Sequence, residues 1–355
     1  MPHNRTTFSK FIIEDQRRRS NPDADLTALL NDIQTACKFI ASAVSRGLLD
    51  RGGAGGYPGA EERGTVHETA DEIMLRECES GGKLCGIVYE GVDEPFQVAL
   101  DYPRGRYLLV FDALDGAANL DVNVTVGSIF AVLRAPSGVD APTVADFLQP
   151  GTQQIAAGYA LYGPTSVLVI TTGHGVHGFT LDREIGAYTL THPEMRIPEE
   201  TCEFAIDASN ERFWEPPIKH YVQECIEGQT GSRGADFNMR WVDSLVLEVN
   251  RILVRGGLFI DPRDTSDASK KGRFRLLYEA NPMAMIVEAA GGAASTGRER
   301  ILDIVPTGLH DRTPVILGSR KEVERLTRLH AEYDRGEELT FKTPLFKTRS
   351  LFRNV

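Results

Sequence analysis

The run RYLLVFD, at positions 106–112, limits most strongly what this chain can fold into. Its residues from Tyr107 to Phe111 are all apolar, and a strand that is apolar on both faces has to be covered on both sides. Other short β-rich runs, punctuated by glycine and proline, lie at 84–90, 128–133, 166–172 and 178–182. The sequence therefore predicts a buried sheet with helices packed against it.

Helical periodicity flanks these strands. Apolar residues recur at intervals of three and four from Leu26 to Val44, which predicts an amphipathic helix, and a second helix is predicted over 68–80. Beyond Pro198, predicted helices at 220–228, 243–257, 281–292 and 321–336 alternate with predicted strands at 204–209, 257–262 and 315–319. The pattern is that of an α/β protein in two parts, predicted at 1–197 and 198–335, with a polar tail at 336–355.

The segment between the first two helices is rich in glycine. RGGAGGYPGAEERG, at 51–64, contains too much glycine for regular structure and is predicted to be a long loop. Loops of this length in compact domains are often lids over a site, but many are plain linkers. The sequence leaves both interpretations open.

The overall composition limits which partners and which cellular compartment the protein can have. The formal net charge of −11 over 355 residues argues against a general nucleic-acid or anionic-membrane surface. An anionic substrate remains compatible, because bound divalent cations reverse the local sign of the field. The five cysteines form no C-x-x-C pair, and no apolar run approaches membrane-spanning length, so we predict a soluble cytoplasmic protein with free thiols.

Acidic residues follow three of the apolar runs. Asp112 and Asp115 lie three apart in FDALDGAANLD, while Glu90 and Glu279 end the runs LCGIVYE and FRLLYE. Carboxylates gathered at strand ends are typical of multi-metal phosphoryl-transfer sites, in which cations lie about 3.5–4 Å apart. Solvated strand ends and helix caps also carry acids, so spacing alone leaves a metal site and a capping turn both open.

The chain resembles the class 1 fructose-1,6-bisphosphatases, particularly their proteobacterial branch, from about residue 8 to residue 332. The resemblance rests on FDALDGAANLD, LQPGTQQIAAGYALYGPTSVLV, RLLYEANPMA, GGAASTG and LDIVPTGLH. It implies a layered α-β-α-β-α sugar-phosphatase fold, a homotetramer, and hydrolysis of a sugar bisphosphate at its 1-phosphate. It also implies dependence on Mg²⁺, with two or more ions per subunit and Mn²⁺ as a substitute.

The resemblance assigns roles to particular residues. Glu90, Asp112, Asp115 and Glu279 would be the metal-binding and catalytic acids, with the backbone carbonyl of Leu114 as a further ligand. The cations would activate a water for in-line attack and neutralise the leaving oxygen. Asp115 and the backbone N–H groups of Gly116, Ala117 and Ala118 would hold the 1-phosphate.

Two departures from the family affect the attacking water. Gly91 stands where the family has the second acid of an S-E-E strand end, and His67 stands where it has an aspartate. In the family these acids are associated with orienting and deprotonating the water. Losing such assistance typically costs about 10²–10⁴-fold in rate.

Further departures lie at the distal end of the sugar pocket. Asp207 replaces a substrate-binding asparagine and Asp261 a tyrosine, while Arg240 is kept and would reach into the neighbouring subunit's site. Trp241 replaces a tyrosine and Arg273 a lysine. Either the arginines pair with these aspartates, or the true substrate offers hydroxyl or cationic groups there.

The resemblance also implies a regulatory site and leaves alternative functions open. Thr27, Arg106, Tyr107 and Arg134 fall where the family binds its inhibitor AMP, but Asp23 and Asp25 add negative charge there, and surface ion pairs are the competing interpretation. The rebuilt sugar pocket is also compatible with a sedoheptulose-1,7-bisphosphatase. A third hypothesis is a catalytically weakened paralogue that regulates a partner.

Overall fold

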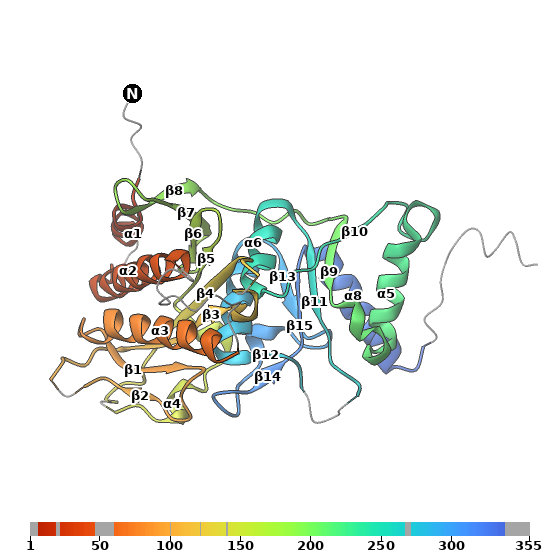
Figure 1. Ribbon diagram of the computed structural model, residues 1–355. Helices are drawn as coiled ribbons and strands as arrows, with labels where there is room; N and C mark the ends of the chain where they lie inside the picture. Colours follow the sequence, from red (N-terminus) through yellow and green to blue (C-terminus); the bar gives the residue numbers. More distant parts are fainter. Residues whose placement is uncertain are drawn as a thin grey trace, which may run out of the picture.

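Two sheets and three helical layers make up the protein (Figure 1). The computed structural model describes residues 6–18, 22–46, 60–99, 101–120, 122–139, 141–266 and 271–337. For 60–65 the description covers the helical backbone alone. None of the helices in these ranges is long and apolar enough to cross a membrane.

An eight-stranded sheet occupies the first half of the chain, in the order β2-β1-β3-β4-β5-β6-β7-β8. β1 and β3 are parallel, and the other neighbouring pairs are antiparallel. The strands are β1 (Leu84–Tyr89), β2 (Phe96–Gln97), β3 (Tyr107–Asp115), β4 (Val126–Arg134), β5 (Ala156–Tyr162), β6 (Ser166–Thr171), β7 (Val176–Asp182) and β8 (Ala187–His192).

A five-stranded sheet follows, in the order β10-β9-β11-β15-β13, together with the small pair β12 and β14. Its strands are β9 (Glu203–Ile206), β10 (Asn238–Met239), β11 (Leu258–Asp261), β13 (Ala293–Ser295) and β15 (Val315–Gly318); the small pair is β12 (Phe274–Arg275) and β14 (Arg312–Thr313). The chain changes sheets between β8 and β9. The domain boundary near residue 197 stays a prediction.

Helices cover both sheets. The outer face of the eight-stranded sheet carries α1 (Phe8–Arg17), α2 (Ala24–Arg46) and α3 (Ala60–Glu79), while α5 (Pro216–Glu227) and α8 (Arg320–Asp334) cover the outer face of the smaller sheet. Between the sheets lie α6 (Leu245–Arg255) and α7 (Asn281–Ala289); α4 (Val144–Phe147) is a short turn of helix. The predicted α-β-α-β-α layering is confirmed.

Three hydrophobic clusters fill the spaces between the layers, and the cluster that contains α6 and α7 reaches both sheets. β3 belongs to two of them at once: Leu108 and Val110 pack toward α6 and α7, whereas Leu109 and Phe111 pack toward α2 and α3. The run is continuously apolar because helices cover both of its faces.

The predicted start of the second helix is wrong. α3 begins at Ala60, inside the segment predicted to be a loop through Gly64. Ala, Glu and Arg at 60–63 favour helix, and a single glycine near the helix start costs only about 1 kcal/mol. Residues 51–59 lie outside the described part of the chain, so the proposed lid stays a prediction.

Candidate active site

An irregularity in β3 brings Asp112 and Asp115 together. Side chains three apart on a regular strand point to opposite faces. The pairing of β3 with β4 shifts register between these two residues, and both acids are buried. One oxygen each from Asp112, Asp115 and Glu279 lie within 4.8 Å of one another. The strand therefore does not end at Asp112, as predicted, but continues through the bulge to Asp115.

Asp115 is held in place by the start of α6. Its Oδ2 accepts hydrogen bonds from the Ser244 hydroxyl at 2.8 Å and from the Val246 backbone N–H at 2.9 Å. Gly116 follows with φ +74°, and a Cβ there would lie 3.1 Å from Cβ of Ser244. The tight left-handed turn and the helix N-terminus together fix the direction of this carboxylate.

Glu279 lies on a helical turn and not at a strand end. After β12 the chain forms one turn of π-helix, Leu276–Ala280, which leads into α7. The backbone N–H of Arg275 donates to Glu279 Oε2. The prediction of a strand end was wrong because a short buried apolar run fits either a strand or a helix.

The acids of this group repel one another, because they have few cationic partners to offset their charges. Burial, and next the charge of Asp112, raise the pKa of Asp115 to about 7, against the hydrogen bonds from α6. Burial and Asp112 likewise raise the pKa of Glu279. Leu114, between the two aspartates, is also buried, and its backbone N–H donates to Asp112 Oδ1 at 2.9 Å. A hard divalent cation, which prefers oxygen ligands, would remove the repulsion, so these residues fit a metal ion.

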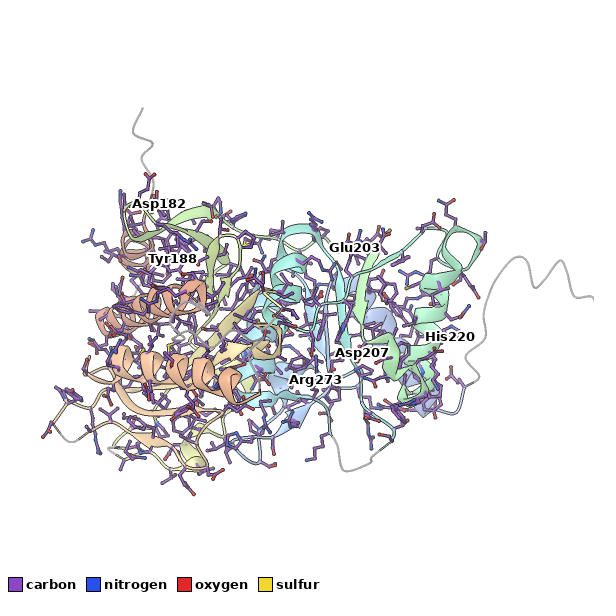
Figure 2. All side chains as sticks on the ribbon, viewed as in Figure 1. Asp182, Tyr188, Glu203, Asp207, His220 and Arg273 are labelled. Carbon is purple, nitrogen blue, oxygen red and sulfur yellow. The ribbon has the colours of Figure 1, made fainter. Side chains whose placement is uncertain are left out.

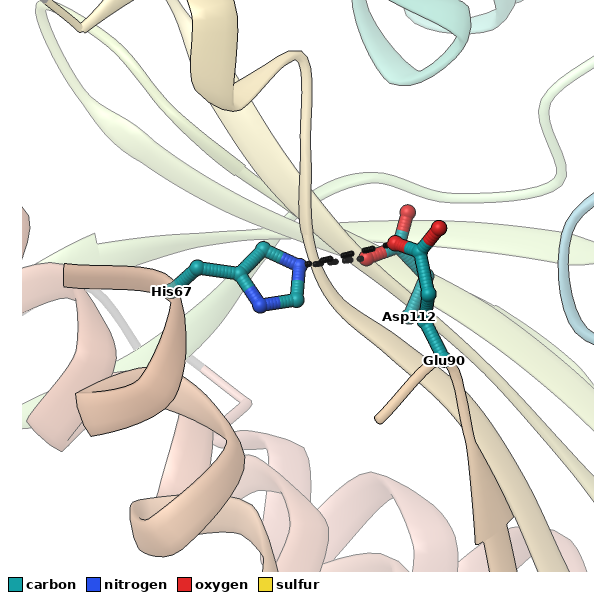
Figure 3. Close-up of side chains that lie close together, drawn as sticks. All are labelled: His67, Glu90 and Asp112. Carbon is teal, nitrogen blue, oxygen red and sulfur yellow. Dashed lines mark ion pairs between the residues drawn. The ribbon is translucent and has the colours of Figure 1, made fainter. Parts of the chain in front are cut away.

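A second group of possible ligands shares Asp112. In Figure 3 the His67 imidazole, from α3, points toward the carboxylates of Glu90 and Asp112. Its Nε2 lies 3.8 Å from an oxygen of each, and its Nδ1 lies 3.3 Å from Asp71. The nearby carboxylates of Asp112 and Asp71 raise the pKa of His67 to about 10. Two adjacent ligand groups joined by one acid are what a two-ion centre requires.

An open pocket of about 560 Å³ connects these groups to the turn after β3. Its lining includes His67, Glu90, Gly91, Ala117 and Ala118. A Cβ on Gly91 would lie 2.8 Å from the Tyr89 ring, which itself stacks on Phe111. A side chain at 91 therefore requires the ring of Tyr89 to move.

Asp207, Asp261 and Arg273 line the distal pocket, which has a volume of about 470 Å³. Figure 2 labels Asp207 and Arg273. Arg273 Nε lies 3.3 Å from Asp261, and Arg273 also pairs with Asp243. Burial raises the pKa of Asp261 to about 6, with the charge of Arg273 opposing it. Asp207 instead accepts hydrogen bonds from Ser209 and Asn210, two and three residues further along the chain.

Trp241 and Arg240 stand at the border of this region. Trp241 stacks on Phe259 with ring centroids 6.0 Å apart, and the Arg273 guanidinium lies 5.8 Å from the Trp241 ring centroid. Arg240 is exposed at the end of β10, with its Nε 3.7 Å from Glu203. Arg273 therefore contacts Asp261 as one of the two hypotheses requires, whereas Arg240 contacts a different acid.

The residues predicted to bind AMP surround an aspartate of the chain itself. Asp23 pairs with Arg106 at 2.8 Å, lies 3.8 Å from Arg134, and accepts a hydrogen bond from the Tyr107 hydroxyl. The Thr27 hydroxyl donates to the Asp23 carbonyl at 3.0 Å. The cationic groups of this site are thus already in contact with a carboxylate.

Sequence reasoning missed three residues that shape the site. Asp71 follows His67 by four on a helix, a spacing that by itself indicates contact. Ser244 precedes an apolar helical run, as N-caps do. Arg275, whose guanidinium lies 3.5 Å from Glu90, gave no comparable signal.

The chain matches two family models, "Fructose-1-6-bisphosphatase, N-terminal domain" over residues 6–193 and "Fructose-1-6-bisphosphatase, C-terminal domain" over residues 197–331. It is 57% identical to a protein of Methylacidiphilum infernorum, over 100% of both chains, and 53% identical to one of Hydrogenophilus thermoluteolus, over 98% of this chain and 97% of that protein. Both relatives are named fructose-1,6-bisphosphatase class 1.

Solved structures give the same result. Leishmania major fructose-1,6-bisphosphatase in its holo form superimposes with a TM-score of 0.83 at 36% identity, and covers 92% of this chain and 99% of that chain. The same enzyme in the T-state gives a TM-score of 0.81. The chain therefore belongs to the fructose-1,6-bisphosphatase family of phosphoric monoester hydrolases. Within that family the predicted class 1 assignment is confirmed, while the proteobacterial branch stays a prediction.

Proposed function

We propose that this protein hydrolyses the 1-phosphate of fructose 1,6-bisphosphate, with Mg²⁺, to fructose 6-phosphate and phosphate. The observation that carries the proposal is that oxygens of Asp112, Asp115 and Glu279 lie within 4.8 Å of one another, with both aspartates buried, beside the turn that opens into the pocket. Its relatives are named for this substrate. This is a reaction of carbohydrate metabolism, in gluconeogenesis or the Calvin cycle.

Glu90, Asp112, Asp115, Glu279 and the Leu114 carbonyl are the proposed ligands for two or more cations per subunit, with Mn²⁺ as a substitute. Bound cations would supply Lewis-acid activation of a water and neutralise charge on the leaving oxygen. The chain itself contributes positioning. Asp115 is fixed by α6 through Ser244, and a carboxylate held in one direction keeps a reacting group aligned.

The 1-phosphate is proposed to bind along the turn Gly116, Ala117 and Ala118. The two alanines lack the serine hydroxyls common in the family, so backbone N–H groups are the donors that remain. Ala117 and Ala118 line the same pocket as His67 and Glu90, which brings the phosphate next to the acids.

The sugar and its second phosphate are proposed to extend toward Asp207, Arg240, Trp241, Asp261 and Arg273. The contact of Arg273 with Asp261 supports a pocket in which an arginine offsets at least one of the two introduced carboxylates. That contact is the one required by the hypothesis of paired aspartates, and it therefore supports fructose 1,6-bisphosphate over a substrate with a cationic end.

The experiment is a substrate panel. Fructose 1,6-bisphosphate, sedoheptulose 1,7-bisphosphate, fructose 6-phosphate and fructose 1-phosphate are incubated with metal-free protein, and then with Mg²⁺, Mn²⁺ or chelator. We expect phosphate release from fructose 1,6-bisphosphate with Mg²⁺, none with chelator, and fructose 6-phosphate as the product by ³¹P NMR. No release from any sugar bisphosphate would leave the weakened paralogue, and faster release from the seven-carbon sugar would favour the sedoheptulose enzyme.

We further propose a cytoplasmic homotetramer in which Arg240 reaches the neighbouring subunit's site. Arg240 follows the exposed edge strand β10, whose Met239 is 48% exposed, so this edge can meet a second copy. Four of the five cysteines are buried free thiols, as suits a reducing compartment. Light scattering of the purified protein gives the subunit number, and a monomer would contradict the proposal.

A further inference from the structure

We infer that His67 is a nitrogen ligand of a divalent transition-metal ion, which it shares with Glu90 and Asp112. The inference deepens the proposed function, since it concerns the second of the two ligand groups in the same site. In the family that the chain resembles, an aspartate stands at this position, so an imidazole changes the ligand chemistry of this chain.

Distances fit a bridging ion. Nε2 of His67 lies 3.8 Å from Glu90 Oε2 and 3.8 Å from Asp112 Oδ1. Hydrogen bonds to a carboxylate are usually about 2.7–3.2 Å, so 3.8 Å is long for direct pairing. Two ligands of one ion, each with a bond of about 2.1 Å, can lie up to about 4.2 Å apart. All three ligand atoms lie within 4.8 Å of one another, so a small adjustment lets them share an ion.

Asp71 orients the His67 imidazole through the nitrogen that faces away from Glu90 and Asp112. His67 Nδ1 lies 3.3 Å from Asp71 Oδ2, one helical turn further along α3. Asp71 is 8% exposed, and its other oxygen, Oδ1, is buried with no hydrogen-bond partner in the described part of the chain. A carboxylate that binds Nδ1–H leaves the Nε2 lone pair for a metal, as is usual for metal-binding histidines. Asp71 is therefore a positioning residue.

The ion can enter and keep further ligands. Glu90 is half exposed, and His67, Asp71 and Glu90 all line the open pocket of about 560 Å³. Phosphate or water from the pocket can complete the coordination of an ion that the protein holds by three atoms. The site is thus open on one side, as catalytic metal sites are.

The donor set decides the kind of ion. Asp112, Asp115 and Glu279 offer oxygen alone, which suits Mg²⁺, whereas His67 adds an imidazole nitrogen that suits first-row transition ions. The two groups share Asp112 and so lie side by side. The site then contains two neighbouring metal positions. One has only oxygen ligands, and the other binds Mn²⁺ or a similar transition ion more tightly than Mg²⁺.

The competing interpretation is a charged imidazolium that pairs with Glu90 and Asp112 in place of a cation. This interpretation explains why the three side chains lie together, but a protonated imidazole cannot form a bond to a metal ion. A measurement that detects that bond separates the two interpretations.

The test uses Mn²⁺ as the probe, bound to the metal-free full-length protein, and pulsed EPR to detect ¹⁴N coupling to the ion. We expect ¹⁴N modulation in the wild type and its loss in His67→Asp, which restores an oxygen-only site. His174→Asn removes an exposed histidine from the turn between β6 and β7, and this control should keep the signal. Persistence of the modulation in His67→Asp, or its absence from wild type with Mn²⁺ bound, overturns the inference, as does failure to bind Mn²⁺.

Metal preference supplies a second readout. Isothermal titration of each metal-free protein with Mn²⁺ and Mg²⁺ gives the ratio of the two affinities, which we expect to fall by about tenfold or more in His67→Asp. Asp71→Asn should keep the ¹⁴N signal while weakening Mn²⁺ binding by about tenfold, as losses of groups that orient a metal ligand do. An unchanged ratio in His67→Asp overturns the proposal. If the protein shows ¹⁴N coupling but releases no phosphate from any sugar bisphosphate, the proposed function is contradicted and the nitrogen ligand is not.

Discussion

Two clusters of buried acids in this molecule have opposite electrostatic character. In the active site, burial and mutual repulsion raise the pKa of Asp115 to about 7. Between α5 and α8, burial would also raise the pKa of Glu224, but hydrogen bonds from His220 and Arg325 and the charge of Arg325 lower it to about 2. Figure 2 shows His220 on α5, in the helical layer that covers the outer face of the smaller sheet.

The difference lies in the partners that the protein supplies. Arg325 donates two hydrogen bonds to Glu224, at 2.9 and 2.5 Å, and Arg233 forms an ion pair with Glu322 at 2.5 Å. The three active-site acids receive N–H and O–H groups, while the nearby Arg275 side chain contacts Glu90 instead. Buried acids with arginine partners are structural, whereas buried acids left with one another require a cation from outside the chain.

The largest expected effect on activity concerns the active-site acids, which have no arginine side chain as a partner among the described residues. Asp115→Asn keeps an oxygen for Ser244 and Val246 but removes a charge that the cation needs. We expect activity to fall by about 10³-fold, as for the loss of a main electrostatic group, with little change in stability. Steady-state assays and thermal melts check this. Retention of more than a tenth of wild-type turnover would contradict the assignment of this acid.

The matching change in the paired cluster is Glu224→Gln. It leaves Arg325 buried opposite a neutral amide, and breaking a buried pair in this way costs about 3–5 kcal/mol of unfolding free energy. Turnover of the folded enzyme should stay at the wild-type value, because the cluster lies between α5 and α8, away from the active site. Urea unfolding and assays at low denaturant give both quantities. Lost activity in a fully folded variant would contradict the division between the two clusters.

The same carboxylate predicts a pH dependence. Its pKa is about 2 in the folded protein against an ordinary value of 4.5, so protonation favours the unfolded chain. The stabilisation is complete above about pH 4.5 and disappears as the pH falls toward 2, and amounts to about 3 kcal/mol. The stability difference between wild type and Glu224→Gln, measured by urea unfolding between pH 6 and pH 3, should shrink accordingly. A difference that stays constant with pH would contradict it.

A paired acid nearer the surface should matter less. Asp23 contacts Arg106, Arg134 and Tyr107 where the family resemblance places AMP. We propose that this carboxylate competes with the nucleotide phosphate, so Asp23→Asn should strengthen AMP inhibition by about fivefold, the value of an ordinary half-exposed ion pair. Inhibition curves with AMP check this, with adenosine as the control without phosphate. Equal inhibition of both proteins would mean that Asp23 does not occupy the site.

Asp261 lies between the two clusters in character, because it is partly buried, contacts one arginine and has a pKa raised to about 6. If Arg273 already offsets it, the double change Asp207→Asn with Asp261→Tyr should alter KM for fructose 1,6-bisphosphate by less than about threefold. A fall of about tenfold, roughly 1.4 kcal/mol, would instead show that the aspartates repel the distal phosphate.

Much of the architecture could be predicted from local pattern. The continuous run in β3 required cover on both faces, the periodicity from Leu26 to Val44 gave α2, and Glu90 follows β1 as expected. The start of α3 and the helical turn at Glu279 could not, because short segments fit more than one backbone conformation until their neighbours select one.

The sequence by itself determined which acids the chain has, the apolar runs before them, and the family motifs that contain them. The tertiary structure decided which acids share a site. The β3 bulge turns Asp112 and Asp115 to one side, and α3 brings His67 against Glu90 and Asp112, while arginines distant in sequence neutralise Glu224 and Glu322. Charge interactions act through space and depend on burial, so the same residue type fits a cation in one cluster and forms a structural ion pair in the other.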